Sequence, residues 1–286
     1  MSILADAQIK ELCQIPNVEI TEFIQDGFAL EKVKRAILLR VKRVAYCSDK
    51  DIESMQFQLN LAEKLLSPNY ERDTTGIISY RLLTELEQSL FKPMISPFVG
   101  EQVRYRVKKE LIPEGGFPLG VMPMISSSDT EKILSYGLSS AGYDVRLSNE
   151  FKVFTNINSV MIDPLDFDEK CLHDHKGDYC IIPPNSYILG VTVETFNIPD
   201  DVMVVCVGKS TYARCGAIIN VTPIEPGFKG KVVIEIANST SLPLKVYADM
   251  GISQFLFFKM TQPAKVPYSS GDRKYQNQDG LTLAKV

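Results

Sequence analysis

The sequence predicts a mainly β protein with an α-helical region near its N-terminus. Two observations lead to this fold class. After about residue 140, short segments rich in Val, Ile, Phe and Tyr alternate with Pro, Gly, Asn and Asp, at intervals of about eight to twelve residues. Before about residue 92, apolar residues recur instead at helical spacing. The regular succession of short strands favours an antiparallel sandwich or barrel over a parallel α/β sheet.

The N-terminal part of the chain is expected to be helical. Residues 1–14 hold one short apolar-periodic segment, and residues 15–92 have a helical texture throughout. Three helices are predicted within the second region, over 31–47, 48–66 and 79–91. The first of them has one apolar stripe, formed by Val33, Ile37, Val41 and Val44.

The remainder of the chain is expected to form strands. Their predicted ranges are 145–153, 179–182, 186–193, 203–207, 217–221, 231–237, 244–248 and 251–259. Turn-forming residues such as Pro183-Pro184-Asn185 and Pro226-Gly227 separate them. The polar tail over 269–286 is expected to be either mobile or ordered by a ligand.

The composition excludes several classes of protein. A formal net charge of −4 gives no global basic field for binding nucleic acid. The apolar runs, such as 202–207, are too short to span a bilayer, and the N-terminus lacks a signal-peptide pattern. Six widely spaced cysteines in a chain of 286 residues are most simply free thiols in a reducing compartment, so a cytoplasmic location without membrane contact is expected.

Two motifs suggest metal or phosphate chemistry, and neither fits its standard pattern. Gly208-Lys209-Ser210 resembles the end of a P-loop, but Met203 stands where that motif needs glycine. Two cysteines and the only two histidines could form a zinc site, but their spacing matches no standard ligand pattern: Cys171, His173, His175 and Cys180. The zinc deaminase signature is absent from the sequence, so no protein-held metal is predicted.

Three reactive side chains carry the functional prediction. Ser210 and Arg214 lie in the segment 208–214, which is expected to consist of short β-type structure, and Glu235 lies on the predicted strand 231–237. Strand alternation places Val233, Glu235 and Ala237 on one face. A lone strand carboxylate is usually solvated, yet Glu235 is the only charge between Lys231 and Lys245, in a segment suited to a core or an interface. Partial burial would raise its pKa towards the range of a proton shuttle.

Several blocks of sequence carry a resemblance to a known family. They are 135–146 (SYGLSSAGYDVR), 154–159 (FTNINS), 181–186 (IIPPNS), 208–216 (GKSTYARCG), 220–226 (NVTPIEP), 232–235 (VVIE), 253–258 (SQFLFF) and 274–280 (KYQNQDG). Through them, residues 130–286 closely resemble the metal-independent dCTP deaminases, which are relatives of the trimeric dUTPases. The resemblance implies a dUTPase-like distorted β-barrel or jelly-roll core.

The resemblance also divides the chain. The segments 2–6 and 95–99 resemble the opening of the family, where the two blocks lie close together in sequence. Residues 1–14 and 93–286 are therefore expected to form one deaminase core, interrupted by a helical insertion over 15–92. The core would include an extra segment over 105–129 and a ligand-covering tail over 269–286.

The resemblance implies a function and a site. The function is hydrolytic deamination of dCTP to dUTP and ammonia, within nucleotide metabolism, with Glu235 as proton shuttle and Ser210 and Arg214 positioning the water and polarising the base. Mg²⁺ would arrive with the triphosphate and zinc would not be used, and the enzyme would be a homotrimer with sites between subunits. The implied substrate-binding residues are Lys209, Thr211, Tyr212, Ala213, Val233, Ile234, Gln254, Tyr268, Lys274 and Gln278.

Two alternatives remain open. One is a bifunctional enzyme that also cleaves dUTP to dUMP and pyrophosphate, or a pure dUTPase. Glu225 and Phe228 stand where dUTPase relatives carry Asp and Tyr, which favours deamination alone. The other is a non-catalytic, nucleotide-sensing binding protein, and the joint presence of Ser210, Arg214 and Glu235 argues against it.

Overall fold

A computed structural model describes residues 2–13, 93–113, 125–157 and 160–285. The chain divides into two compact units, one made of Met1–Ile9 and Ile95–Val286, the other of Lys10–Met94. The helices predicted over 31–47, 48–66 and 79–91 lie outside the described residues. Among the described helices, none is long and apolar enough to cross a membrane.

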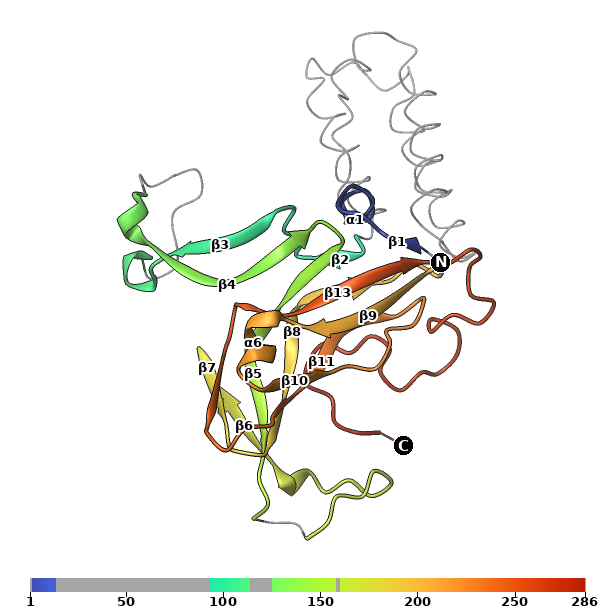
Figure 1. Cartoon of the computed structure of the whole chain (residues 1–286). Coiled ribbons are helices and arrows are strands. Elements are labelled where there is room, and N and C mark those ends of the chain that lie inside the picture. Colours follow the sequence, from blue (N-terminus) through green and yellow to red (C-terminus); the bar gives the residue numbers. More distant parts are fainter. Residues whose placement is uncertain (1, 14–92, 114–124, 158–159, 286) are drawn as a thin grey trace, which may run out of the picture. The chain divides into compact units, whose positions relative to one another are not determined.

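The first unit is mainly β (Figure 1). Its described residues form thirteen strands, and every paired set of strands is antiparallel. Eleven strands share one sheet, whose main path runs β1-β13-β5-β8-β11-β10, while β12 and β7 form a separate pair. The strands are β1 Ser2–Ile3, β2 Ile95–Ser96, β3 Gln102–Val107, β4 Thr130–Ser139, β5 Gly142–Phe154, β6 Leu172–Lys176, β7 Tyr179–Ile182, β8 Tyr187–Asn197, β9 Val202–Gly208, β10 Ala217–Asn220, β11 Lys229–Asn238, β12 Leu244–Tyr247 and β13 Gly251–Lys259.

The predicted antiparallel arrangement is confirmed, and so are all eight predicted strands. The strands β7 and β13 have the predicted bounds, and the others differ by a few residues at their ends. The strand β6 was not predicted, because its polar residues are exposed and have no apolar alternation. The hairpin of β3 and β4 was also not predicted, and it flanks most of the extra segment 105–129.

The short helix expected within residues 1–14 is confirmed as α1 (Asp6–Cys13), which follows the pairing of β1 with β13. One local prediction is wrong. The segment 208–214 was expected to be β-type, but Ser210–Arg214 forms the short helix α6 after β9 ends. A single helical turn is too short to show a helical period in its sequence.

The core is built from the inward faces of the central strands. Phe255 of β13 packs against Phe196 of β8, with ring centroids 5.0 Å apart, and Tyr143 and Phe151 of β5 are also buried. The strands β9 and β10 belong to different parts of the sheet, because β9 pairs with β13 and β10 pairs with β11. The connection between them contains α6 (Figure 1), so that helix lies on a link between the two parts.

Candidate functional site

The predicted catalytic hydroxyl and guanidinium lie at the two ends of α6. Ser210 is the first residue of this helix and Arg214 is the last, and the Nη1 group of Arg214 donates a hydrogen bond to the Ser210 carbonyl at 3.0 Å. Both residues are exposed, as are Thr211 and Ala213 between them. The helix therefore presents these side chains on the protein surface.

Tyr212 differs from its neighbours on α6. Its side chain is 4% exposed, and its hydroxyl accepts a hydrogen bond from the backbone N–H of Tyr247 at 3.1 Å. Burial raises the pKa of Tyr212 to about 12, so the hydroxyl stays neutral. The side chain anchors α6 to the protein, which leaves only the backbone of Tyr212 for contact with a ligand.

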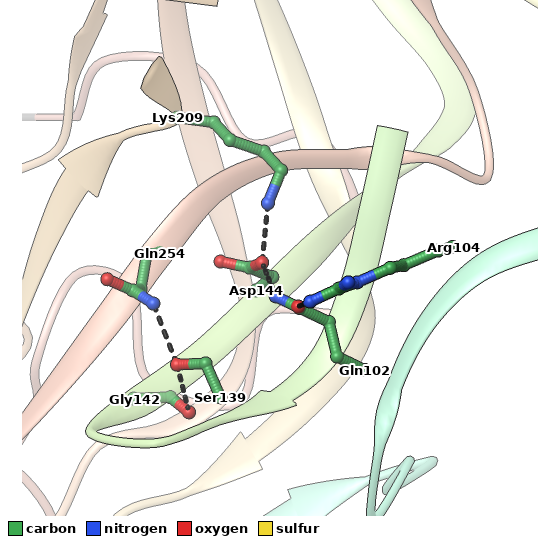
Figure 2. Close-up of polar contacts among 7 residues, drawn as sticks. All are labelled: Gln102, Arg104, Ser139, Gly142, Asp144, Lys209 and Gln254. Carbon is green, nitrogen blue, oxygen red and sulfur yellow. Dashed lines mark hydrogen bonds and ion pairs between the residues drawn. The ribbon is translucent and has the colours of Figure 1, made fainter. Parts of the chain in front are cut away.

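Lys209, the residue just before α6, belongs to a polar cluster (Figure 2). Its ammonium forms an ion pair with Asp144 of β5, whose side chain is 4% exposed. The same carboxylate oxygen accepts a hydrogen bond from Nε2 of Gln102 at 3.0 Å. Gln254 of β13 lies in the same region and donates to the Ser139 hydroxyl at 2.8 Å. The structure therefore brings Lys209 and Gln254 together with Asp144, a partner that the sequence reasoning missed.

Asp144 has one recognisable signal in the sequence. It is an acidic residue in the otherwise largely apolar run from Tyr143 to Leu147, and burial of such a charge requires a partner. That partner, Lys209, is 65 residues away along the chain. Such a separation gives no local pattern from which the pairing could be predicted.

Glu235 lies near one end of the main sheet path, where β11 is next to the terminal strand β10. It is on β11, opposite Asn220 of β10 and Leu189 of β8. The side chains of Val233, Glu235 and Ala237 are partly exposed, whereas Ile234 between them is fully buried, which confirms the predicted alternation. Burial raises the pKa of Glu235, although a backbone hydrogen bond opposes this effect. The buried side chain of Ile234 leaves only its backbone available to a ligand.

The C-terminal tail lies along the beginning of β11. The backbone N–H of Lys231 donates to the Gln278 carbonyl at 2.9 Å, and Nε2 of Gln278 donates to the Lys231 carbonyl at 2.6 Å. Gly230, at φ 132°, permits this approach, because a Cβ atom there would lie 2.6 Å from the Gln278 carbonyl oxygen. The tail was expected to be mobile or ordered by a ligand, but it is instead held by hydrogen bonds to its own chain.

Two other predicted binding residues, Tyr268 and Lys274, precede Gln278 in the sequence. The Tyr268 hydroxyl accepts a hydrogen bond from the Tyr275 N–H at 3.4 Å, and its ring centroid is 5.8 Å from that of Phe228. The Lys274 side chain is exposed, and its carbonyl accepts from the Lys285 ammonium at 3.2 Å.

The predicted site residues thus form two groups within one chain. We call them the α6 group, with Lys209, Ser210, Thr211, Arg214 and Gln254, and the β11 group, with Val233, Glu235, Tyr268 and Gln278. Among the contacts of the described residues, no hydrogen bond or ion pair joins Glu235 to Ser210 or Arg214. A single chain therefore does not assemble the expected catalytic set through direct contacts.

The described residues form no cluster that could coordinate a metal ion. Within 2–13, 93–113, 125–157 and 160–285, no three His, Cys, Asp or Glu side chains come together in a way that could hold a metal ion. Cys171 and Cys180 are buried free thiols, and burial raises the pKa of Cys180 to about 11. Nε2 of His175 lies 2.8 Å from the Tyr179 carbonyl oxygen, at hydrogen-bond distance.

Comparison with known proteins gives a consistent result. Residues 126–260 match a family model described as dCTP deaminase-like. The chain is 52% identical over 166 residues to the dCTP deaminase of Campylobacter concisus (strain 13826), which covers 58% of this chain and 89% of that protein. The chain belongs to the dCTP deaminase family. A second relative, the dCTP deaminase of Rickettsia bellii (strain OSU 85-389), is 53% identical over 190 residues, covering 66% of this chain and 89% of the relative.

The range that matches the dCTP deaminase-like model contains α6 and Glu235. Residues 14–92 and the tail beyond 260 lie outside that range. A solved structure, that of 2'-deoxycytidine 5'-triphosphate deaminase from Agrobacterium tumefaciens, is 18% identical with a TM-score of 0.35. That match covers 42% of this chain and 39% of the other.

Proposed function

We propose that this chain converts dCTP and water to dUTP and ammonia, with Glu235 as the proton carrier and without zinc. Membership of the dCTP deaminase family supports the reaction. The observation that carries the mechanism is the environment of Glu235, a partly buried carboxylate in the middle of β11 whose pKa is raised by burial. A carboxyl group with a raised pKa can accept and return a proton closer to neutral pH than an ordinary glutamate can.

The proton balance of the reaction fits a single carboxylate. Water adds to C4 of the cytosine ring, and Glu235 takes one proton from that water. The same carboxyl group delivers the proton to N3, then moves a proton from the added oxygen to the exocyclic amine, which leaves as ammonia. Acid–base catalysis of this kind contributes about 10² to 10⁴ in rate, so fixed dipoles and orientation must supply the rest.

Ser210 and Arg214 would supply those dipoles from a second copy of the chain. Within one chain they do not contact Glu235, and both are exposed at the ends of α6. A homotrimer with three sites between neighbours satisfies these requirements.

The remaining predicted residues would bind the nucleotide. Lys209, Thr211 and Lys274 would contact the triphosphate, together with backbone groups of Tyr212 and Ala213. The base would be read by Val233, by the backbone of Ile234 and by side chains of the α6 and β11 groups, which include Gln254, Tyr268 and Gln278. Mg²⁺ would be held mainly by phosphate oxygens and water, as this ion commonly is in nucleotide sites.

Two further proposals concern the chain as a whole. Residues 15–92 would be an insertion in one dUTPase-like deaminase core, and the division of the chain at Lys10–Met94 supports this view. A cytoplasmic location is supported by the free thiols of the described cysteines, which are Cys171, Cys180, Cys206 and Cys215.

The deciding experiment compares wild type, Glu235→Gln and a matched control, Glu150→Gln. Glu150 is an exposed carboxylate on β5 that pairs with Lys176 at 3.0 Å. Each protein is incubated with dCTP, dCMP, CTP or dUTP, and products are separated by chromatography. We expect ammonia and dUTP from dCTP with wild type and control, and a loss of at least about 10²-fold in turnover with Glu235→Gln while dCTP still binds.

Other outcomes have definite meanings. Substantial turnover by the Glu235→Gln variant would show that Glu235 is not the proton carrier. Pyrophosphate and dUMP among the wild-type products would identify a bifunctional enzyme instead. Nucleotide binding without any turnover would identify a sensing protein.

A further inference from the structure

The side chains next to Glu235 on its face of the sheet are all neutral. The strand register identifies them, because residues that pair across two antiparallel strands lie on the same face. Glu235 pairs with Leu189 of β8 and with Asn220 of β10. The adjoining positions on this face are Val233, Ala237, Tyr187 and Ile218.

Tyr187 is the largest of these neighbours. It pairs with Ala237, two residues beyond Glu235, so Tyr187 and Glu235 are diagonal neighbours on adjacent strands. Diagonal neighbours are about 7 to 8 Å apart, which is within reach of aromatic and long side chains. The pKa of Tyr187 is raised by burial, by Cys171 and also by the charge of Glu235, which agrees with this proximity.

The ring of Tyr187 is held by a second aromatic side chain. It stacks on Phe154 of β5, with ring centroids 5.0 Å apart and planes at 19°. Both rings are half-buried. Among the hydrogen bonds of the described residues, none includes the Tyr187 hydroxyl. The position of the side chain therefore depends on ring packing and not on its hydroxyl.

The charged groups on the elements around Glu235 are engaged elsewhere. Lys152 of β5 pairs with Leu189 in the register, and its ammonium lies 2.6 Å from a carboxylate of β6. On β11 itself, Lys231 binds a carboxylate of the tail at 3.0 Å. Cys206 of β9 has its pKa raised to about 11, mainly by burial, so its thiol is neutral. Burial among neutral side chains therefore dominates the environment of Glu235.

We propose that Tyr187 is a positioning residue for deamination, because its ring, held by Phe154, covers one side of the Glu235 carboxyl group and keeps water from it. This inference rests on the proposed role of Glu235 as the proton carrier. A carboxyl group with less access to water is protonated more easily, so the ring contributes to the raised pKa of Glu235. Tyr187 itself neither gives nor takes a proton in the reaction.

The first test is the pH dependence of kcat/KM for dCTP in wild type, Tyr187→Ser and Tyr187→Phe. Removal of the ring admits water, so the loss of activity in acid should move to lower pH. At the pH where wild type keeps about a tenth of its plateau value, we expect Tyr187→Ser to keep about a quarter of its own plateau. Tyr187→Phe retains the ring and should follow the wild-type profile.

A matched control removes a tyrosine that lies away from this face. Tyr105 of β3 is 59% exposed, and Tyr105→Ser should leave the pH profile unchanged. Circular dichroism verifies that each variant is folded. If Tyr187→Ser does not fold, Phe154→Leu removes the stacking partner instead, and it should move the profile in the same direction by a smaller amount.

The second test measures the effect of Tyr187 on Glu235 without any nucleotide. A buried carboxylate with a raised pKa destabilises the fold at pH 7, where it is ionised, so Glu235→Gln should increase the free energy of unfolding there. Urea unfolding at one protein concentration measures this gain in three backgrounds. We expect the gain in the Tyr187→Ser background to be at most about half of that in wild type, and the gain in the Tyr187→Phe background to equal it.

Three results would overturn the proposal. They are an unchanged pH profile in Tyr187→Ser, an equal shift in Tyr187→Phe or in the Tyr105→Ser control, and an equal gain from Glu235→Gln in all three backgrounds. Because the unfolding measurements need no turnover, failure of the proposed function is a separate result. A reduced gain in an inactive protein would support the effect of Tyr187 on Glu235 and reject only the deaminase activity.

Discussion

The separation of the α6 and β11 groups within one chain makes a complementation experiment decisive. If each site takes Glu235 from one copy and Ser210 with Arg214 from the next, two inactive variants should restore each other. We choose Glu235→Gln, which damages only the β11 side, and Arg214→Gln, which damages only the α6 side. Each variant alone is expected to lack deamination, because every site in a pure assembly has one damaged half.

The expected recovery follows from counting the halves of each site. In an equal mixture that assembles at random, one half of the copies supply an intact Glu235 and one half supply an intact Arg214. The two contributions to a site come from different copies, so about a quarter of the sites are complete. Ammonia release by the mixture should therefore reach about a quarter of the wild-type value. The two variants are co-expressed with different affinity tags, and mixed assemblies are purified through both tags in succession, which somewhat increases this fraction.

A matched mixture provides the control. Ser210→Ala and Arg214→Gln both damage the α6 side, so an intact Ser210 and an intact Arg214 never occur on the same α6 helix in their mixture. No recovery is expected there. If the mixture of Glu235→Gln and Arg214→Gln also stays inactive although both tags co-purify, each site must be formed within one chain, and the proposed assembly would be wrong.

Three further predictions concern charge. Because burial raises the pKa of Glu235, kcat/KM for dCTP should fall as pH decreases through that raised value, at a pH above the 4.5 of an ordinary glutamate, and a pH–rate profile measures this. Since a carboxyl group with a raised folded-state pKa destabilises the fold once it ionises, Glu235→Gln should be more stable than wild type at pH 7, and this gain should disappear below about pH 4 in denaturant titrations. Arg146→Ala should lower the free energy of unfolding by about 3 to 5 kcal/mol, because it leaves the fully buried Glu194 carboxylate without the guanidinium 2.8 Å away. Urea unfolding measures this loss, and the double change Arg146→Met/Glu194→Leu should recover most of it, whereas a loss below about 1 kcal/mol in the single variant would contradict the argument.

The strands that could be predicted are those with one buried face. On β11 the residues Val232, Ile234 and Ile236 are buried and their neighbours are partly exposed, and this alternation is visible in the sequence. On β6 only Leu172 is even partly buried, and the strand is held by pairing with β5. That pairing is a property of the partner strand, so composition alone could not reveal it.

The candidate site shows the same division between local and non-local information. Glu235 could be proposed from its surroundings in the sequence, because an isolated charge in an apolar strand is unusual. The helix Ser210–Arg214 could not be predicted, because it depends on an anchoring tertiary contact that is not visible in the sequence. That anchor is the buried side chain of Tyr212, whose hydroxyl is bonded to the backbone of Tyr247.

The ion pair of Lys209 changes how phosphate recognition should be understood. From the sequence, Lys209 is the obvious cation for a triphosphate, but Asp144 compensates its charge in a place where both side chains are largely buried. Such a pair contributes little long-range attraction, because opposite charges in contact cancel beyond a short distance. Attraction of a highly charged nucleotide then requires cations near the site whose charge no carboxylate compensates.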